Sequence, residues 1–438
     1  MSKFLTRLGL LCLAMSGYLF DSYDFLLFSF SSFLIYSALT SKGFNERFFS
    51  YFFFGYLLIP FLNISEYRGV VGIDTLAIYC VVQFLFLMIV FAFETKERRF
   101  GSGVEYTSTS MTELLYLVHM SIVYLAVAYV YTAIGPIVIR QDLRFNIPPT
   151  IEYVIKSGLV LPLFWVYFDR KKIDIKNAVY KFLVPIIPSL LIGSRGTFMI
   201  VLVAIFISLY MFGALGPSVV RNRYGWFYNN SKKIAIAGLM LALFALYSGF
   251  YLRRDGVDLI TAEDAINEYG FVSDGVAVKA ILPLYMGLRE TVGLTHRIIE
   301  DDIENLTETP LFYSELLTFL PGHQVAPGIV LAVDIYRAQG ADEKYSLTPG
   351  IVGGIYLDYK YLFFPIIAGF ALLLIVLFNM GVGNMKWRLI YVLTLVQFFH
   401  LYHRGFMKLE YFVPYVVLSA YFITLVYFEI KEKRNGNV

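Results

Sequence analysis

Apolar stretches of helix length recur along this chain and are separated mostly by short polar connections. They lie at about 4–20, 23–39, 48–64, 72–93, 113–134, 150–168, 178–193, 196–214, 233–251, 361–380, 387–402 and 411–429. Most match the roughly 17–25 residues with which an α-helix crosses the hydrocarbon core of a bilayer. Because an α-helix satisfies its backbone hydrogen bonds internally, it is stable in lipid. The pattern therefore predicts an all-α polytopic integral membrane protein with about 12 transmembrane helices.

The composition excludes an ordinary soluble protein. Of the 438 residues, 58% are hydrophobic and 16% are charged, whereas about a quarter of a typical soluble domain is charged. Aromatic residues make up 18% of the chain, and most of these rings are expected to pack in the membrane or at its interfaces. Both cysteines, Cys12 and Cys80, lie in apolar stretches, so the sequence predicts neither a disulfide framework nor a metal cluster.

One long polar interruption divides the chain into three parts. Residues 1–251 contain the first nine predicted helices with short loops, and residues 361–438 contain the last three helices and a tail. Between them, residues 252–360 form a long connection with most of the acidic residues. Within this connection, 311–322 and 327–336 have the spacing of amphipathic helices that lie on a membrane surface.

Positive charge gathers on alternate connections of the predicted bundle. The basic clusters lie at 42–47, 96–99, 169–181, 221–233, 385–388 and 431–434. If the N-terminus is inside, all of them fall on the cytoplasmic side, as the positive-inside rule requires. The sequence therefore predicts a multi-pass protein with both termini in the cytoplasm and with residues 252–360 outside it.

Arginine predominates over lysine on the side predicted to be extracytoplasmic. The arginines of that side are Arg68, Arg140, Arg144, Arg195, Arg253, Arg254, Arg289, Arg297, Arg337 and Arg404. Arg195 interrupts LLIGSRGTFMIVLVAIF (190–206), and Arg404 lies in HRG (403–405), so each precedes a glycine at the outer end of a predicted span. A planar guanidinium binds phosphate or carboxylate through two hydrogen bonds. The pattern indicates an anionic ligand, although interfacial snorkelling of long cationic side chains is the competing explanation.

Several short segments together resemble one known family. These are SRG (194–196) before a helix, the long connection between late spans, TPGIVGGIYLDY (348–359) leading into the next span, and Arg-Gly near the end of the penultimate span. The layout resembles that of the bacterial oligosaccharide repeat-unit polymerases, the Wzy-type O-antigen polymerases. The glycine that often follows the tyrosine-containing segment in this family is missing here. The apolar stretch 348–364 is itself short for a span and is expected to be a re-entrant segment.

The resemblance implies a GT-C-like membrane glycosyltransferase of the bacterial cytoplasmic (inner) membrane. Such enzymes transfer a growing glycan en bloc from undecaprenyl pyrophosphate to a newly flipped repeat unit at the outer leaflet, in the biosynthesis of lipopolysaccharide or a related polysaccharide. The implied partners are the undecaprenyl-pyrophosphate-linked oligosaccharide donor and acceptor, a chain-length-regulating co-polymerase and membrane lipids. No nucleic acid, cofactor or metal is expected, and the chain has no Walker A, GxSxG, dinucleotide or HExxH motif.

This chemistry assigns roles to two sets of residues. The arginines expected to bind the substrate and stabilise its pyrophosphate leaving group are Arg195, Arg404, Arg253, Arg254, Arg140 and Arg144. The candidates for the general base that takes the proton of the acceptor hydroxyl are His403, His323, Asp255 and Glu290. His403 ranks first because it adjoins Arg404 and because histidine titrates near neutral pH.

Two other functions stay open at this point. An O-antigen ligase would use the same lipid donor and the same arginine clusters, and its decisive histidine in the long connection would be His323. A transporter, such as a flippase or permease, belongs to a different class. Transporters often contain internal repeats and charged residues at the bilayer midplane, whereas here the arginines lie at the predicted ends of spans and no repeat is visible.

Overall fold

The computed structural model describes most of the chain as helices. Residues 1, 96–109, 138–142, 144–145, 169–178, 193–202, 206, 209–239, 241–269, 272–275, 306–309, 315, 317–326, 333–346 and 436–438 lie outside the described residues. The described remainder contains helices, turns and bends and no β-strand. The expected all-helical fold is therefore confirmed for this part of the chain.

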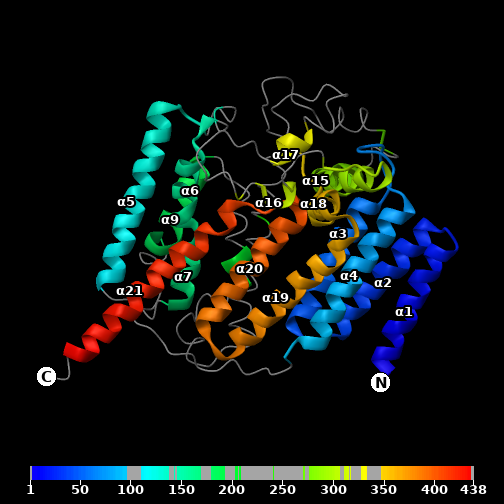
Figure 1. The fold of residues 1–438 in the computed structure, drawn as a ribbon, viewed down its shortest axis with the longest axis horizontal. Coiled ribbons are helices and arrows are strands. Elements are labelled where there is room, and N and C mark those ends of the chain that lie inside the picture. The colour runs from blue at the N-terminus through cyan, green and yellow to red at the C-terminus, as the bar shows by residue number, and fades with distance from the viewer. Residues whose placement is uncertain are drawn as a thin grey trace.

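The larger group of helices lies on the right in Figure 1. It consists of α1 (Ser2–Leu19), α2 (Tyr23–Thr40), α3 (Phe44–Phe61), α4 (Ile73–Phe93), α19 (Phe363–Gly383) and α20 (Met385–Arg404). Along the chain α1 packs on α2 and α2 on α3, while α19 lies against both α4 and α20. The last two helices of this group thus close against helices that precede them by roughly 300 residues.

A second group lies on the left in Figure 1. It consists of α5 (Ser110–Ala133), α6 (Pro149–Ser157), α7 (Leu161–Phe168), α9 (Val184–Leu191) and α21 (Val413–Asn435). The predicted span 150–168 is broken into α6 and α7 by a 3₁₀ turn at Gly158–Val160. Three helices are joined by His119 of α5, whose Nε2 lies 2.7 Å from Ser157 Oγ and whose Nδ1 lies 3.3 Å from the Tyr421 hydroxyl. The two groups meet where α7 contacts α20.

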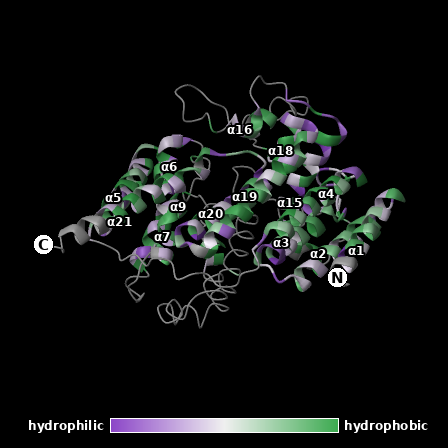
Figure 2. Ribbon diagram, turned by 60° about the horizontal axis from the view of Figure 1, so that its bottom comes forward, coloured by the Kyte–Doolittle hydropathy of each residue, from purple (hydrophilic) through white to green (hydrophobic). Residues whose placement is uncertain are grey.

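The helices have the length and surface of membrane-spanning segments. Among the described residues, α2, α4, α5 and the run Gly350–Val382 are long and apolar enough to cross a bilayer. Large apolar side chains face outward, such as Leu125, Val416 and Ile423, which are 69%, 70% and 69% exposed. Apolar residues predominate along the helices in Figure 2. Such surfaces are stable against lipid and unstable in water, so the chain is a helical membrane protein. The predicted spans 196–214 and 233–251 fall almost wholly outside the described residues.

One end of the molecule carries four further helices. They are α15 (Val276–Glu300), α16 (Leu311–Ser314), α17 (Pro327–Val330) and α18 (Gly350–Tyr359). They lie at the top of Figure 1, whereas both chain ends lie at the bottom. We call these the α15 end and the terminal end. The α2–α3 and α19–α20 turns, which carry two of the basic clusters, lie at the terminal end.

The described part of the long connection contains one helix that its sequence pattern does not predict. The stretches 311–322 and 327–336, expected to be amphipathic helices, contain α16 and α17, while most of their remaining residues lie outside the described part of the chain. The main helix is α15, which the sequence analysis does not predict. The expected re-entrant stretch 348–364 contains α18, which is mostly buried and joins α19 through a bend at Lys360 with φ 49°.

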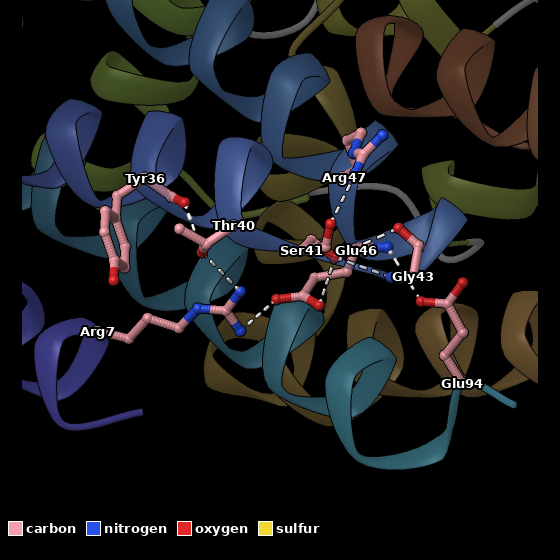
Figure 3. A network of polar contacts seen from close by, with 8 residues as sticks. All are labelled: Arg7, Tyr36, Thr40, Ser41, Gly43, Glu46, Arg47 and Glu94. Carbon is pink, nitrogen blue, oxygen red and sulfur yellow. Dashed lines mark hydrogen bonds and ion pairs between the residues drawn. The ribbon is translucent and has the colours of Figure 1, made fainter. Parts of the chain in front are cut away.

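A polar network holds the terminal end together (Figure 3). Glu94, which ends α4, accepts the backbone N–H of Asn45 at 2.9 Å and that of Glu46 at 3.3 Å, and so caps the first turn of α3. Glu46 in turn pairs with Arg7 of α1 and accepts the Ser41 hydroxyl at 2.6 Å. Because these buried polar groups bond to one another, they fix the ends of the helices that meet here.

Candidate functional site

The C-terminal end of α20 is held by aromatic rings from α3. The rings of Phe52 and Phe399 have centroids 4.4 Å apart, and Tyr56 and Tyr402 meet edge to face at 4.8 Å. The Tyr56 ring then lies 6.3 Å from the His403 ring. Aromatic pairs of this geometry stabilise a structure beyond the area they bury, so the α3–α20 contact fixes where His403 lies.

His403 is partly buried and meets a hydroxyl group from each of two helices. Its Nδ1 lies 3.3 Å from the Tyr56 hydroxyl and 3.3 Å from Oγ1 of Thr291 in α15. The Thr291 hydroxyl also donates to the carbonyl oxygen of His403 at 3.3 Å. In the tautomer that carries its proton on Nδ1, Thr291 Oγ1 accepts from Nδ1–H and directs its own proton to that carbonyl. In this tautomer the lone pair of Nε2 is able to take a proton.

The turn after His403 depends on close contact between glycines. Gly405 ends α20 in the left-handed conformation, with φ 89°, and its N–H donates to Leu401 O at 2.8 Å. A Cβ on Gly354 of α18 would overlap the carbonyl oxygen of Gly405, and a Cβ on Gly405 would overlap that of Gly350. Only glycine permits backbones to approach so closely. The stretch TPGIVGG therefore packs directly on HRG, and Arg404 is left exposed beside this contact.

A second arginine contacts α15. Arg68, in the connection between α3 and α4, has its Nη2 atom 3.8 Å from Oε1 of Glu290. The two side chains are 30% and 31% exposed, so both reach the surface. Glu290 immediately precedes Thr291, the residue that contacts His403. Adjacent residues of α15 thus contact Arg68 and His403, the neighbour of Arg404 in the chain.

The tyrosine-containing end of α18 secures part of the long connection. The Asp358 carboxylate accepts the backbone N–H groups of Leu311 at 3.0 Å and Phe312 at 2.6 Å, and the side-chain amide of Asn305 at 2.8 Å. Lys360 lies 2.6 Å from Asp302. These contacts hold residues 302–305 and 310–312 against α18, close to Met407, whose N–H donates to Phe312 O at 2.7 Å.

A further histidine of α15, His296, contacts the start of α4. His296 Nδ1 lies 3.0 Å from Thr75 Oγ1 and 3.4 Å from the backbone nitrogen of Gly72, and its Nε2 lies 3.1 Å from Glu300. Burial lowers the pKa of His296, although the neighbouring Glu300 acts in the opposite direction. The neutral ring can accept hydrogen bonds at the start of α4. His296 therefore has a structural role at this end of the molecule.

The structure describes three of the predicted site residues. His403 and Arg404 lie together at the end of α20, and Glu290 is joined to them through Thr291. The predicted residues Arg140, Arg144, Arg195, Arg253, Arg254, Asp255 and His323 lie outside the described residues. Sequence reasoning missed Tyr56 and Thr291, for which no motif gives a signal. Arg68 was noted only as one of the arginines predicted to be extracytoplasmic.

This arrangement combines a proton acceptor with an exposed cation. With its proton on Nδ1, His403 can take a proton from a hydroxyl group at Nε2, and Arg404 can bind an anionic group. Comparison of the chain with known protein families, curated proteins and solved structures finds no match. Any assignment of function therefore depends on the residues and their geometry.

Proposed function

We propose that this protein is a membrane glycosyltransferase that polymerises undecaprenyl-pyrophosphate-linked oligosaccharide repeat units. It transfers the growing glycan en bloc to a repeat unit at the outer leaflet of the bacterial cytoplasmic membrane. The product is O-antigen or a related surface polysaccharide. The partners in this proposal are the lipid-linked donor and acceptor and a chain-length-regulating co-polymerase.

The observation that supports the proposal most is the contact between TPGIVGG and HRG. These two segments carry much of the resemblance to the Wzy-type polymerases and are separated by some 50 residues in the sequence. Their glycines meet at Gly354 and Gly405. This contact lies beside His403 and Arg404, the residues for which a base and a phosphate-binding role were predicted from sequence.

The proposed reaction uses these side chains as follows. The acceptor hydroxyl oxygen attacks the anomeric carbon of the donor, and its proton passes to His403 Nε2. The bond from that carbon to the pyrophosphate oxygen breaks, and undecaprenyl pyrophosphate leaves with the electron pair. Arg404 stabilises the negative charge that grows on the leaving group. The arginines outside the described residues, above all Arg195, Arg253 and Arg254, would complete the binding of the pyrophosphate.

The proposal also includes a membrane topology. About 12 spans in a GT-C-like arrangement would place the α15 end on the extracytoplasmic side and both termini in the cytoplasm. Residues 252–360 would then lie over the outer leaflet, where the lipid-linked donor and acceptor meet. Support comes from the basic clusters 42–47 and 385–388, which lie at the terminal end with both chain ends.

The test is reconstitution with a synthetic lipid-pyrophosphate repeat unit and separation of the products on a gel. Wild type is expected to form a ladder. His403→Gln should lower the rate by about 10²–10⁴-fold, the range of general-base catalysis. Arg404→Ala should lower it by about 10²–10³-fold, as does loss of one donor to a developing charge. Lys42→Ala, which removes an exposed cation at the terminal end, is the matched control and should keep the wild-type rate.

Other products would identify other functions. A ladder of unchanged intensity from both His403→Gln and Arg404→Ala would refute the site. Transfer to a lipid A-core acceptor, with no ladder from the repeat unit alone, would identify a ligase. Movement of the lipid-linked glycan between leaflets, with no bond formed, would identify a transporter.

A further inference from the structure

Arg289 of α15 is a fully buried arginine with an unusual set of partners. Its side chain is 0% exposed. It donates to the carbonyl oxygens of Pro60 at 2.6 Å, Tyr67 at 3.3 Å and Gly69 at 2.5 Å, and to Oδ1 of Asn63 at 2.7 Å. All four acceptors belong to the end of α3 and to its connection with α4. A buried guanidinium is stable only when its donors are satisfied, so Arg289 and this connection fix each other.

Arg68 lies between two of these bonds and has a strained backbone. Its φ is 63°, a left-handed conformation that is unfavourable for any residue other than glycine. Arg289 holds the carbonyl on either side, at Tyr67 and Gly69. Arg68 also packs closely on Gly293 of α15. A Cβ added to Gly293 would lie 2.5 Å from the Cβ of Arg68. Residues kept in such conformations by their surroundings gather at functional sites.

The strained conformation directs Arg68 to the surface of the α15 end. Its guanidinium lies 5.5 Å from the Tyr67 ring centroid and 3.8 Å from Glu290, and its side chain is 30% exposed. Arg404 directly follows His403 in the chain, and His403 contacts Thr291, the neighbour of Glu290 in α15. Arg68 and Arg404 are thus connected through the adjacent residues Glu290 and Thr291, and both side chains reach the surface.

We infer that Arg68 is a further binding residue for a phosphate group at the α15 end, and that Arg289 is the residue that positions it. The inference rests on the proposed function and adds an arginine from the α3–α4 connection to the predicted pyrophosphate site. Glu290 pairs with Arg68 while the site is empty. A bound phosphate group replaces Glu290 as the partner of the Arg68 guanidinium. A guanidinium held in place beforehand binds more tightly than one that must be ordered on binding.

The test is direct binding in detergent, with farnesyl pyrophosphate as the probe and farnesol as the uncharged comparison. Arg68→Ala should weaken farnesyl pyrophosphate binding about tenfold, as the loss of one charged contact does. Arg289→Lys should weaken it by a similar factor, because one ammonium group cannot reach four acceptors in the connection. If Arg289 acts through Arg68, the double variant should bind no more weakly than Arg68→Ala. Farnesol should bind all variants equally.

A second variant tests the role of Arg68 while the buried guanidinium of Arg289 is kept. Gly293→Ala displaces Arg68 while the Arg289 side chain itself is retained, and it should also weaken binding of the probe about tenfold. Gly287→Ala, in the same helix where a new Cβ meets nothing within 4 Å, is the control and should bind as wild type. Wild-type affinity in both Arg68→Ala and Gly293→Ala would overturn the binding role of Arg68. Additive losses in the double variant would overturn the positioning role of Arg289.

Two comparisons distinguish a lipid phosphate from a free phosphate, and the binding role of Arg68 from the polymerase activity. Much weaker binding of inorganic pyrophosphate than of farnesyl pyrophosphate would assign the site to a lipid, and equal binding would assign it to the free anion. Binding that depends on Arg68, in a protein that forms no ladder, would support the inference and refute the polymerase. If the polymer ladder forms at the same rate and with the same donor affinity after Arg68 is replaced, the polymerase is supported and the inference is refuted.

Discussion

Gly354 of α18 packs directly on the carbonyl group of Gly405, the left-handed residue that ends α20. We expect Gly354→Ala to force the two helices apart, because the new methyl group would overlap backbone and not a movable side chain. Overpacking of this kind destabilises a protein by about 1–3 kcal/mol. Thermal unfolding in detergent measures the change. Gly369→Ala in α19, where a new Cβ meets nothing within 4 Å, should leave stability unchanged.

Thr291 should matter for activity through its hydroxyl group. Its oxygen lies 3.3 Å from His403 Nδ1 and its proton is directed to the His403 carbonyl, which favours the tautomer whose Nε2 lone pair can take the acceptor proton. Thr291→Val keeps the shape and removes the acceptor, and we expect the rate of polymer formation to fall about tenfold. Thr291→Ser restores the oxygen and should recover most of the rate. Equal rates for the Val and Ser variants would show that the hydroxyl has no part in the reaction.

His296 should make folding stability depend on pH. Burial lowers its pKa in the folded protein below the usual 6.5, so the unfolded chain binds a proton more readily than the folded one in that range. The contribution of neutral His296 to folding stability is therefore fully present above about pH 6.5 and is lost as the pH drops towards the folded pKa. Unfolding temperatures at about pH 7.5 and about pH 5.5 should differ more for wild type than for His296→Asn, which cannot titrate. An equal difference in both proteins would contradict this assignment.

Glu94 should stabilise the terminal end by capping α3. Its carboxylate accepts two backbone N–H groups of α3 and the Asn45 side-chain amide. Glu94→Ala leaves these buried donors unpaired, and we expect a loss of about 1–3 kcal/mol. Glu94→Gln keeps one oxygen and should lose less. The control is Glu304→Ala, a side chain that is 67% exposed in a surface pair with Lys360, where a change below about 0.5 kcal/mol is expected.

Hydropathy alone predicts most of the long helices. The stretches 23–39 and 72–93 correspond to α2 (Tyr23–Thr40) and α4 (Ile73–Phe93) within about a residue. The reason is physical, because the thickness of the bilayer sets the length of an apolar helix and the helix satisfies its own backbone. The break between α6 and α7 was not predicted, since a broken span and a continuous one have the same apolar composition.

The helix that organises the candidate site was also missed. The buried residues of α15 include Leu282, Tyr285, Arg289, Val292 and His296, which have helical spacing. An arginine and a histidine occupy two of these positions, so a pattern of apolar residues does not reveal the buried face. Arg289 is buried only because the α3–α4 connection offers four acceptors to it.

The sequence by itself determined the helical membrane class, the lengths of several long apolar helices, and the position of His403 and Arg404 as neighbours in one motif. Only the tertiary structure decided what these residues meet. Thr291 and Tyr56 lie 112 and 347 positions away from His403 in the chain, and both contact its Nδ1. The hydropathy of a helix states how much of it is apolar and not which helix it packs on. That choice depends on the shapes and polar groups of both surfaces, and it is made only when the chain folds.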